Sequence, residues 1–152
     1  MKQTLLIITA LMLVVGCSEP INIDELVERD GIWHSKDTNK PYSGKAVKYL
    51  ENGQKELEGN YKDGKKEGIE TEWYENGQKK SEGTYKNGKD DGLYTKWYEN
   101  GQKKSELNYK DGKQDGLWNF WFENGQKGYE GTYKNGEEIS VKEWNEDGSV
   151  KE

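Results

Sequence analysis

The segment Trp73-Tyr74-Glu75-Asn76-Gly77-Gln78-Lys79 is the part of the sequence that best predicts the local structure. It contains Asn-Gly, the strongest short-range signal for a tight hairpin turn, because both residues tolerate positive φ angles. Segments of about eight residues flank the turn on both sides, a length typical of strands, and neither has an apolar stripe at helical spacing. The stretch therefore predicts a β-hairpin.

The same turn recurs at a fixed spacing of 24 residues. Glu-Asn-Gly-Gln-Lys occurs at 51–55, 75–79, 99–103 and 123–127. Tyr-Lys-(Asp/Asn)-Gly occurs at 61–64, 85–88, 109–112 and 133–136. A third series in the same phase consists of Gly44, Gly68, Gly92 and Gly116, and a degraded turn, Glu146-Asp147-Gly148, follows. Three series in phase indicate a repeat architecture, so we expect an all-β meander of stacked hairpins with about ten strands.

The composition shows what must hold these hairpins together. The chain has 152 residues, a net charge of −6 and 30% hydrophobic residues, against about 45–50% in an ordinary globular domain. Residues 17–152 contain only 17 Leu, Ile, Val and Phe residues but all 18 aromatic residues of the chain. Aromatic rings therefore replace an aliphatic core. The acidic balance, with lysines interleaved among glutamates, argues against nucleic-acid binding.

The type of turn decides which side chains share a face. A two-residue loop would pair Glu75 with Gln78, whereas a three-residue loop with a left-handed Gly77 pairs Tyr74 with Gln78. We favour the second register because it gathers apolar residues on one face. The side chains expected there are Ile69, Thr71, Trp73, Ser81, Gly83 and Tyr85, with Leu57, Leu93, Leu107, Leu117, Trp121 and Tyr129 at equivalent positions.

One strand departs from the alternation of polar and apolar residues. In residues 117–122, only Asn119 is polar, whereas a strand with one solvated face should alternate. Either the C-terminal segment or curling of the sheet covers these rings, or they bind a partner. The candidate partner-binding residues are Trp118, Phe120 and Phe122, with Tyr94 and Tyr98 in the preceding repeat.

The N-terminus has the features of an export signal. Lys2 precedes an apolar run from Leu5 to Val15, which ends in Gly16-Cys17. This segment resembles a bacterial lipoprotein signal, which implies cleavage before Cys17, lipidation of that cysteine, and an envelope location on the outer membrane if the host is Gram-negative. We therefore expect a signal peptide at 1–16, a lipidated tether at 17–30 and a repeat domain at 31–152.

Residues suited to catalysis or metal binding are scarce. The chain has one cysteine and one histidine, His34, and its carboxylates recur at equivalent repeat positions, whereas a catalytic pair should occur once. The acidic turns 63–67 and 90–92 contain lysines and lack the ligand spacing of a calcium loop. We expect no enzyme activity, no metal and no cofactor.

The repeated motifs resemble the MORN repeat, specifically the bacterial MORN-variant repeats that bear the YwqK-type antitoxin label. The resemblance rests on residues 73–79 and 83–89, their copies 24 residues apart, and the segment 38–44, and it spans roughly 31–152. It implies an open, twisted, antiparallel sheet of a single layer.

Repeat arrays present extended surfaces and generally bind other molecules. We therefore expect a non-enzymatic, membrane-anchored interaction module for a protein partner, including an immunity- or antitoxin-like role in which an acidic surface meets a basic toxin. The alternative is a glycan- or cell-wall-binding lipoprotein, because rows of aromatic rings suit stacking on sugars. The two edges of an open sheet would also allow an edge-paired homodimer.

Overall fold

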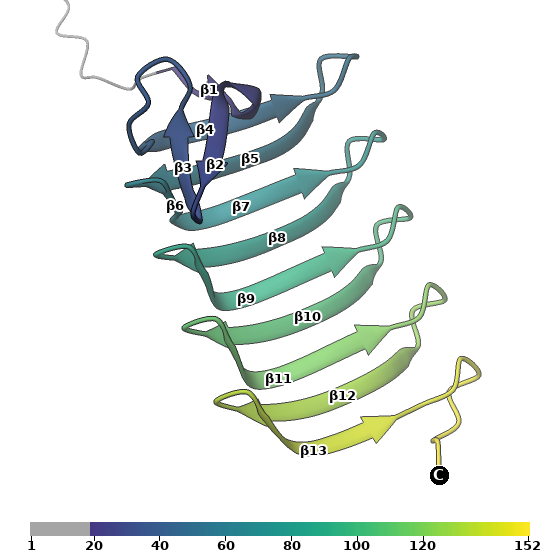
Figure 1. The fold of residues 1–152 in the computed structure, drawn as a ribbon. Coiled ribbons are helices and arrows are strands. Elements are labelled where there is room, and N and C mark those ends of the chain that lie inside the picture. The colour runs from purple at the N-terminus through teal and green to yellow at the C-terminus, as the bar shows by residue number, and fades with distance from the viewer. Residues whose placement is uncertain (1–18) are drawn as a thin grey trace, which may run out of the picture.

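The computed structural model describes residues 19–152 and shows one long, open, single-layer sheet (Figure 1). Its strand order is β1-β4-β5-β7-β8-β9-β10-β11-β12-β13, with β6 paired beside β5, so the predicted repeat sheet is confirmed. Cys17 and the signal peptide expected at 1–16 lie outside the described residues. Within residues 19–152, no helix is long and apolar enough to cross a membrane.

Each repeat contributes two strands to the sheet. The first strands of the successive hairpins are β4 (Gly44–Tyr49), β7 (Gly68–Trp73), β9 (Lys89–Trp97), β11 (Lys113–Trp121) and β13 (Glu137–Glu143). The second strands are β5 (Lys55–Lys62), β8 (Lys79–Lys86), β10 (Lys103–Lys110) and β12 (Lys127–Lys134). The short strand β6 (Lys65–Lys66) lies in the connection between β5 and β7.

The Asn-Gly turns have the predicted three-residue loop. The Tyr74 N–H donates to the Gln78 carbonyl at 2.9 Å, the Gly77 N–H donates to the Tyr74 carbonyl at 2.9 Å, and Gly77 has a φ of 82°. A residue with a side chain would be strained at this angle, which explains why glycine recurs at this position of every turn.

The predicted assignment of side chains to faces is wrong beyond each turn. Trp73 pairs with Lys79, but Glu72 pairs with Ser81, so Lys80 is an extra residue in a β-bulge. One inserted residue moves all the following side chains of its strand to the other face. Ser81, Gly83, Tyr85, Leu57, Leu107 and Tyr129 therefore lie opposite Ile69, Thr71, Trp73, Leu93, Leu117 and Trp121, not beside them.

The two faces consequently bear different rings. The indole face has Trp73, Trp97, Trp121 and Trp144, and lysine ammonium groups lie over these rings, for example Lys79 at 5.8 Å from the Trp97 centroid. The opposite face has Tyr61, Tyr85, Tyr109 and Tyr133, one in each second strand. Stacked lysines screen the indoles from water and add a cation–π attraction.

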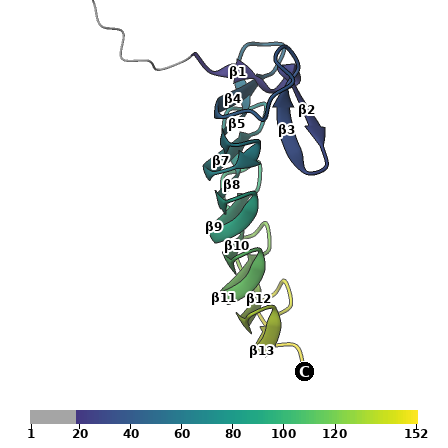
Figure 2. The ribbon, with the colours of Figure 1, turned by 60° about the vertical axis from the view of Figure 1, so that its left-hand side comes forward.

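An N-terminal hairpin packs on the tyrosine side of the sheet (Figures 1 and 2). It consists of β2 (Leu26–Arg29) and β3 (Ile32–Ser35), preceded by β1 (Ile21–Asn22) and a 3₁₀ turn, η1 (Ile23–Glu25). Trp33 packs edge-on against Tyr61 at 6.0 Å, and Leu26 and Ala46 are buried beside them. We call this side the hairpin face. Part of the segment expected to be a tether at 17–30 is thus folded onto the sheet.

Candidate interaction surface

The repeated polar residues of the turns hold neighbouring repeats together. The Asn76 side chain accepts from the Gln78 N–H at 2.9 Å within its own turn and donates to the Glu99 carbonyl of the next turn at 3.0 Å. Asn124 makes the same two contacts, to Gln126 and Glu146, at 2.9 Å each. Asparagine therefore recurs because its side chain closes each turn, and at Asn76 and Asn124 it also joins that turn to the next, which is a structural role.

The repeated carboxylates on the indole face also have a structural role. Glu58, Glu82, Glu106 and Glu130 each accept a hydrogen bond from the lysine three residues earlier. The first of these carboxylates also accepts from Lys45 at 2.8 Å, and these bonds hold the pKa of Glu58 below its usual range. Their recurrence therefore follows from packing and charge pairing.

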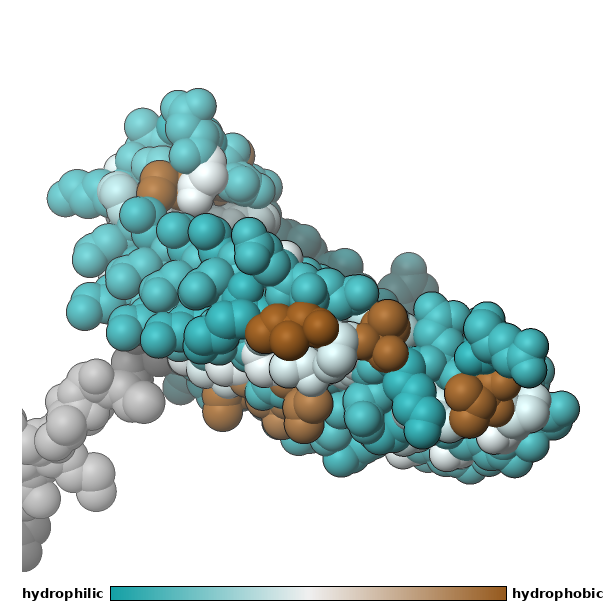
Figure 3. Space-filling view, turned by 90° about the horizontal axis from the view of Figure 1, so that it is seen from below, coloured by the Kyte–Doolittle hydropathy of each residue, from teal (hydrophilic) through white to brown (hydrophobic). Residues whose placement is uncertain are grey.

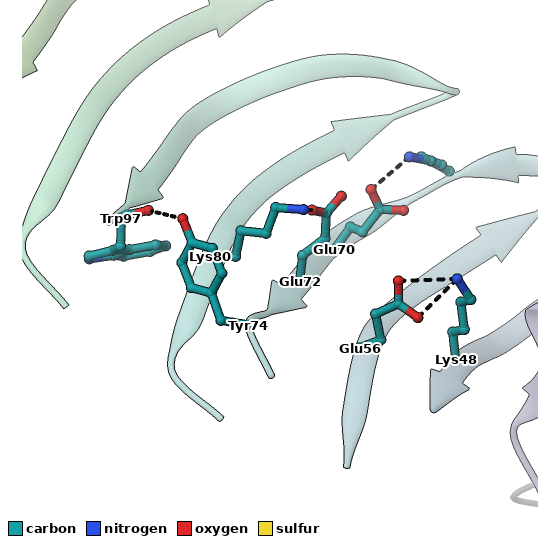
Figure 4. Close-up of polar contacts among 8 residues, drawn as sticks. Lys48, Glu56, Glu70, Glu72, Tyr74, Lys80 and Trp97 are labelled. Carbon is teal, nitrogen blue, oxygen red and sulfur yellow. Dashed lines mark hydrogen bonds and ion pairs between the residues drawn. The ribbon is translucent and has the colours of Figure 1, made fainter. Parts of the chain in front are cut away.

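On the hairpin face, one pair of neighbouring positions, one in each strand of the hairpin, has different residues in successive repeats. In the first repeat, Lys48 forms an ion pair with Glu56 at 2.9 Å. In the second repeat the charges are reversed, and Glu72 lies 3.4 Å from Lys80 (Figure 4). At the C-terminal end, Glu143 and Lys151 form the equivalent pair at 3.1 Å.

The two repeats between these ion pairs lack one. In the third repeat, both positions are lysine, Lys96 and Lys104, and neither has a carboxylate within 4.0 Å among residues 19–152. Their ammonium groups lie over tyrosine rings instead, 5.5 Å from the Tyr94 centroid and 5.3 Å from the Tyr98 centroid. Two uncompensated positive charges therefore lie side by side on an acidic protein.

The fourth repeat has an apolar hollow at the same place. Phe120 and Gly128 occupy the two positions that form ion pairs in the first two repeats. They line a hollow of about 340 Å³ together with Tyr98, Phe122 and Tyr129. The polar residues that line it include Lys104, Glu143 and Lys151. A Cβ atom on Gly128 would lie 2.8 Å from Cε2 of Phe122. The Phe122 ring thus occupies space that the lysine of the second and third repeats would fill.

The structure places all five predicted binding residues on the hairpin face. Tyr98, Phe120 and Phe122 line the apolar hollow, and Phe120 is 37% exposed. Trp118 lies between Tyr109 and Tyr133, with its ring 5.2 Å from each, and its indole N–H donates to the Asn108 carbonyl at 2.9 Å. Tyr94 lies one hairpin away and lines a second hollow of about 300 Å³. Neighbouring rings therefore cover Trp118, whereas Phe120 faces an open space.

Four further residues complete this surface, and the prediction did not include them as candidates. They are Lys96, Lys104, Gly128 and Tyr129. The last three lie on second strands, whose faces were misassigned. A signal was present in the sequence, because Gly128 and Tyr129 stand where the two preceding repeats have Lys-Ser.

A family model described as the MORN repeat variant matches residues 42–63, 66–87, 90–111 and 114–135. The chain belongs to the MORN repeat variant family. Repeats of this family are generally protein- or membrane-binding modules, and the family is a non-enzymatic one. No curated protein matches the chain. Each MORN match covers one hairpin, so the ion-paired, lysine and apolar positions are equivalent positions of successive MORN units.

Two phenols of this MORN sheet near the candidate surface, those of Tyr98 and Tyr109, have a raised pKa. Burial, followed by the charges of Asp90 and Tyr94, raises the pKa of Tyr109. Burial, together with the charges of Glu123 and Glu146, raises the pKa of Tyr98. A protonated Tyr98 donates to the Trp121 carbonyl at 2.7 Å and so joins two MORN units. At the hollow, Tyr98 therefore contributes a ring surface, and its hydroxyl is a hydrogen-bond donor.

Figure 3 views the sheet from the β13 end and shows separate hydrophobic patches in a mostly hydrophilic surface. All seven residues of β13 are exposed, including Ile139 at 65%. The other end of the sheet is different, because β1 pairs along β4. Of these two ends, the β13 end therefore has the longer unpaired strand.

Proposed function

We propose that this MORN-repeat chain is a non-enzymatic, membrane-anchored interaction module that binds a protein partner on its hairpin face. The observation that supports it is the apolar hollow beside Phe120. It lies at the positions where the second repeat has the ion pair Glu72–Lys80. Exposed apolar surface on a soluble sheet is costly unless a partner covers it. Convergent rings with a few polar groups at the margin are typical of binding sites.

The proposed anchor is a lipid on Cys17. Its support is in the sequence alone, because the sole cysteine directly follows Gly16 at the end of an apolar run. Two or three acyl chains would hold the protein firmly on a membrane, since each buried methylene contributes about 0.8 kcal/mol. The sheet would then face the periplasm or the cell exterior. Labelling cells with a palmitate analogue tests this, because Cys17→Ser should abolish both label and membrane recovery.

The partner surface is tested by comparing two variants of the full chain in its native membrane. Phe120→Asp puts a charge into the hollow, and Leu93→Asp puts the same charge at a 46% exposed position on the indole face. After crosslinking and affinity purification, we expect the Phe120 variant to lose a protein that wild type and the Leu93 variant retain. If all three recover the same proteins, the hairpin face is not the partner site.

Glycan binding is the second candidate from the sequence, and the ring geometry argues against it. Sugars stack on flat, accessible ring faces, but Phe120 meets Trp118 and Tyr129 edge-on at interplanar angles of 60° and 77°. Lysines lie over Trp73, Trp97, Trp121 and Trp144 on the indole face. Titration with peptidoglycan fragments should therefore leave the tryptophan fluorescence unchanged. An immunity- or antitoxin-like role remains within our proposal and depends on the identity of the captured partner.

A further inference from the structure

We propose that the partner docks through an acidic segment that has one large apolar side chain, with its carboxylates on Lys96 and Lys104 and its apolar side chain in the hollow beside Phe120. The inference rests on the proposed function, a protein partner on the hairpin face, and adds the chemistry of the segment that binds there.

The lysine pair is the first observation. Like charges on adjacent strands destabilise a sheet by roughly the amount that opposite charges stabilise it. The first two MORN units avoid this cost with the pairs Lys48–Glu56 and Glu72–Lys80, and the C-terminal segment avoids it with Glu143–Lys151. An occupant with carboxylates would relieve the repulsion between Lys96 and Lys104. It would also restore the ion pairing that the first two units have at these positions. On a protein with a net charge of −6, this local positive charge favours an acidic segment over a basic one.

The hollow is the second observation. Its rings come from Tyr98, Phe120, Phe122 and Tyr129, and it lies beside the lysine pair, because Lys104 lines both this hollow and the second one with Lys96. Gly128 makes room for the Phe122 ring in this lining, because a side chain at that position would collide with the ring. The aromatic lining and size suit one leucine or aromatic side chain.

The sheet spacing sets the distance between the two sites. Lys96 and Phe120 occupy equivalent positions in β9 and β11, which are two strands apart. At about 4.8 Å between strands, the two positions are about 10 Å apart. An extended segment covers this distance in about three residues when it runs across the strands. The N-terminal hairpin covers the face further along, which bounds the surface at that end.

A membrane surface is the competing occupant. Anionic lipid attracts proteins through clusters of four to eight basic residues. Here only two unpaired lysines are grouped, and carboxylates of Glu72 and Glu143 lie at the two sides of the site. The observations therefore favour an acidic protein segment.

The test uses the full chain in detergent and a set of labelled ten-residue peptides. Each peptide has two adjacent glutamates and one phenylalanine, separated by one to seven serine or glycine residues. By fluorescence anisotropy, we expect tightest binding near a separation of three residues, and at least tenfold weaker binding when lysines replace the glutamates or serine replaces the phenylalanine. No binding by any peptide at 1 mM would overturn the inference, as would binding of the Cys17→Ser chain, in detergent-free buffer, to phosphatidylglycerol vesicles but not to the peptides.

Variants identify the site. Lys96→Glu with Lys104→Glu should weaken peptide binding at least tenfold, whereas Lys62→Glu with Lys86→Glu makes the same change in net charge at exposed positions elsewhere and should leave it unchanged. Gly128→Lys, which restores the residue of the preceding repeats, should also weaken binding at least tenfold. Equal effects of the two double variants would refute the assignment.

The native partner separates this inference from the proposed function. If Phe120→Asp loses the partner but the double reversal of Lys96 and Lys104 retains it, the acidic-segment inference fails and the proposed function stands. If neither variant loses any protein, the proposed function fails as well.

Discussion

The aromatic rings of the hairpin face lie directly on the strand backbone, and Gly83 provides the sharpest test of this packing. A Cβ atom at Gly83 would lie 2.3 Å from Cδ2 and 2.7 Å from Cε2 of Tyr94. At the equivalent Gly59, the nearest atom is Oε2 of Glu70, at the end of its side chain and at the longer distance of 3.2 Å. Neither glycine has a positive φ, so alanine introduces no backbone strain at either position.

The expected energies follow from these distances. Tyr94 must move by about 1 Å to accept alanine, and overpacking of this kind costs about 1–3 kcal/mol. Replacing glycine by alanine returns about 0.4–1 kcal/mol by restricting the unfolded chain. Gly83→Ala should therefore lower the free energy of unfolding by about 1–2 kcal/mol, and Gly59→Ala should change it by less than about 0.5 kcal/mol in either direction.

Urea unfolding followed by circular dichroism measures both variants. Tyr94→Ala provides the control, because without the ring Gly83→Ala should no longer destabilise the sheet, and the double-mutant cycle should give a coupling of about 1–2 kcal/mol. If Gly83→Ala is as stable as Gly59→Ala, or if the coupling is zero, the Tyr94 ring does not lie over Gly83 and the described packing is wrong.

Three further measurements test other contacts. Asn124→Ala should lower the free energy of unfolding by about 1–2 kcal/mol, because the variant loses one hydrogen bond within its turn and one to the next turn. Asn52→Ala should lower it by less, because the Asn52 side chain makes no bond to the next turn. Urea titrations compare the two variants. Burial raises the pKa of Tyr61 and Tyr85, so their contribution to the free energy of unfolding should be fully present below pH 10 and decrease above it. Phenolate absorbance should rise as the circular dichroism of the strands is lost. Ionisation without unfolding would contradict this. Lysine hydrogen bonds lower the pKa of Glu58, so its contribution is present above about pH 4.5 and lost as the pH falls further, and Glu58→Gln should flatten the acid limb of the stability curve.

The local chemistry of the turns could be predicted from the sequence, but the faces of the strands could not. Asn76-Gly77 specifies its own loop, and the Tyr74–Gln78 pairing was predicted correctly. The extra residue at Lys80 has no signature of its own, because lysine is common on exposed strands and a bulge needs no special residue there. Since a single inserted residue reverses the alternation, this one missed bulge moved half of the expected apolar stripe to the wrong side.

The candidate site shows the same limit. Trp118, Phe120 and Phe122 were identified because their own strand departs from alternation, and that property is visible within one segment. Gly128 and Tyr129 belong to the paired strand, and their contribution depends on the register across the hairpin. Comparison among the repeats, instead of along one strand, would have identified them, since Gly128 stands where Lys80 and Lys104 stand in the preceding repeats.

Comparison among the repeats also separates the residues that maintain the fold from those available for binding. Asparagine recurs in the turn of every unit, and the indole-face position is Tyr49 in the first unit and tryptophan in the following ones, because each unit must stack on the next. The first-strand position of the ion pairs on the hairpin face, which we call the row, changes from Glu72 to Lys96 to Phe120 in successive units, while the backbone pairing stays the same. A position that takes an acid, a base and an aromatic ring within one continuous sheet is not determined by stacking. Its residues can therefore be exchanged for binding at little cost to the sheet, and variants of this row should alter partner affinity before they alter stability.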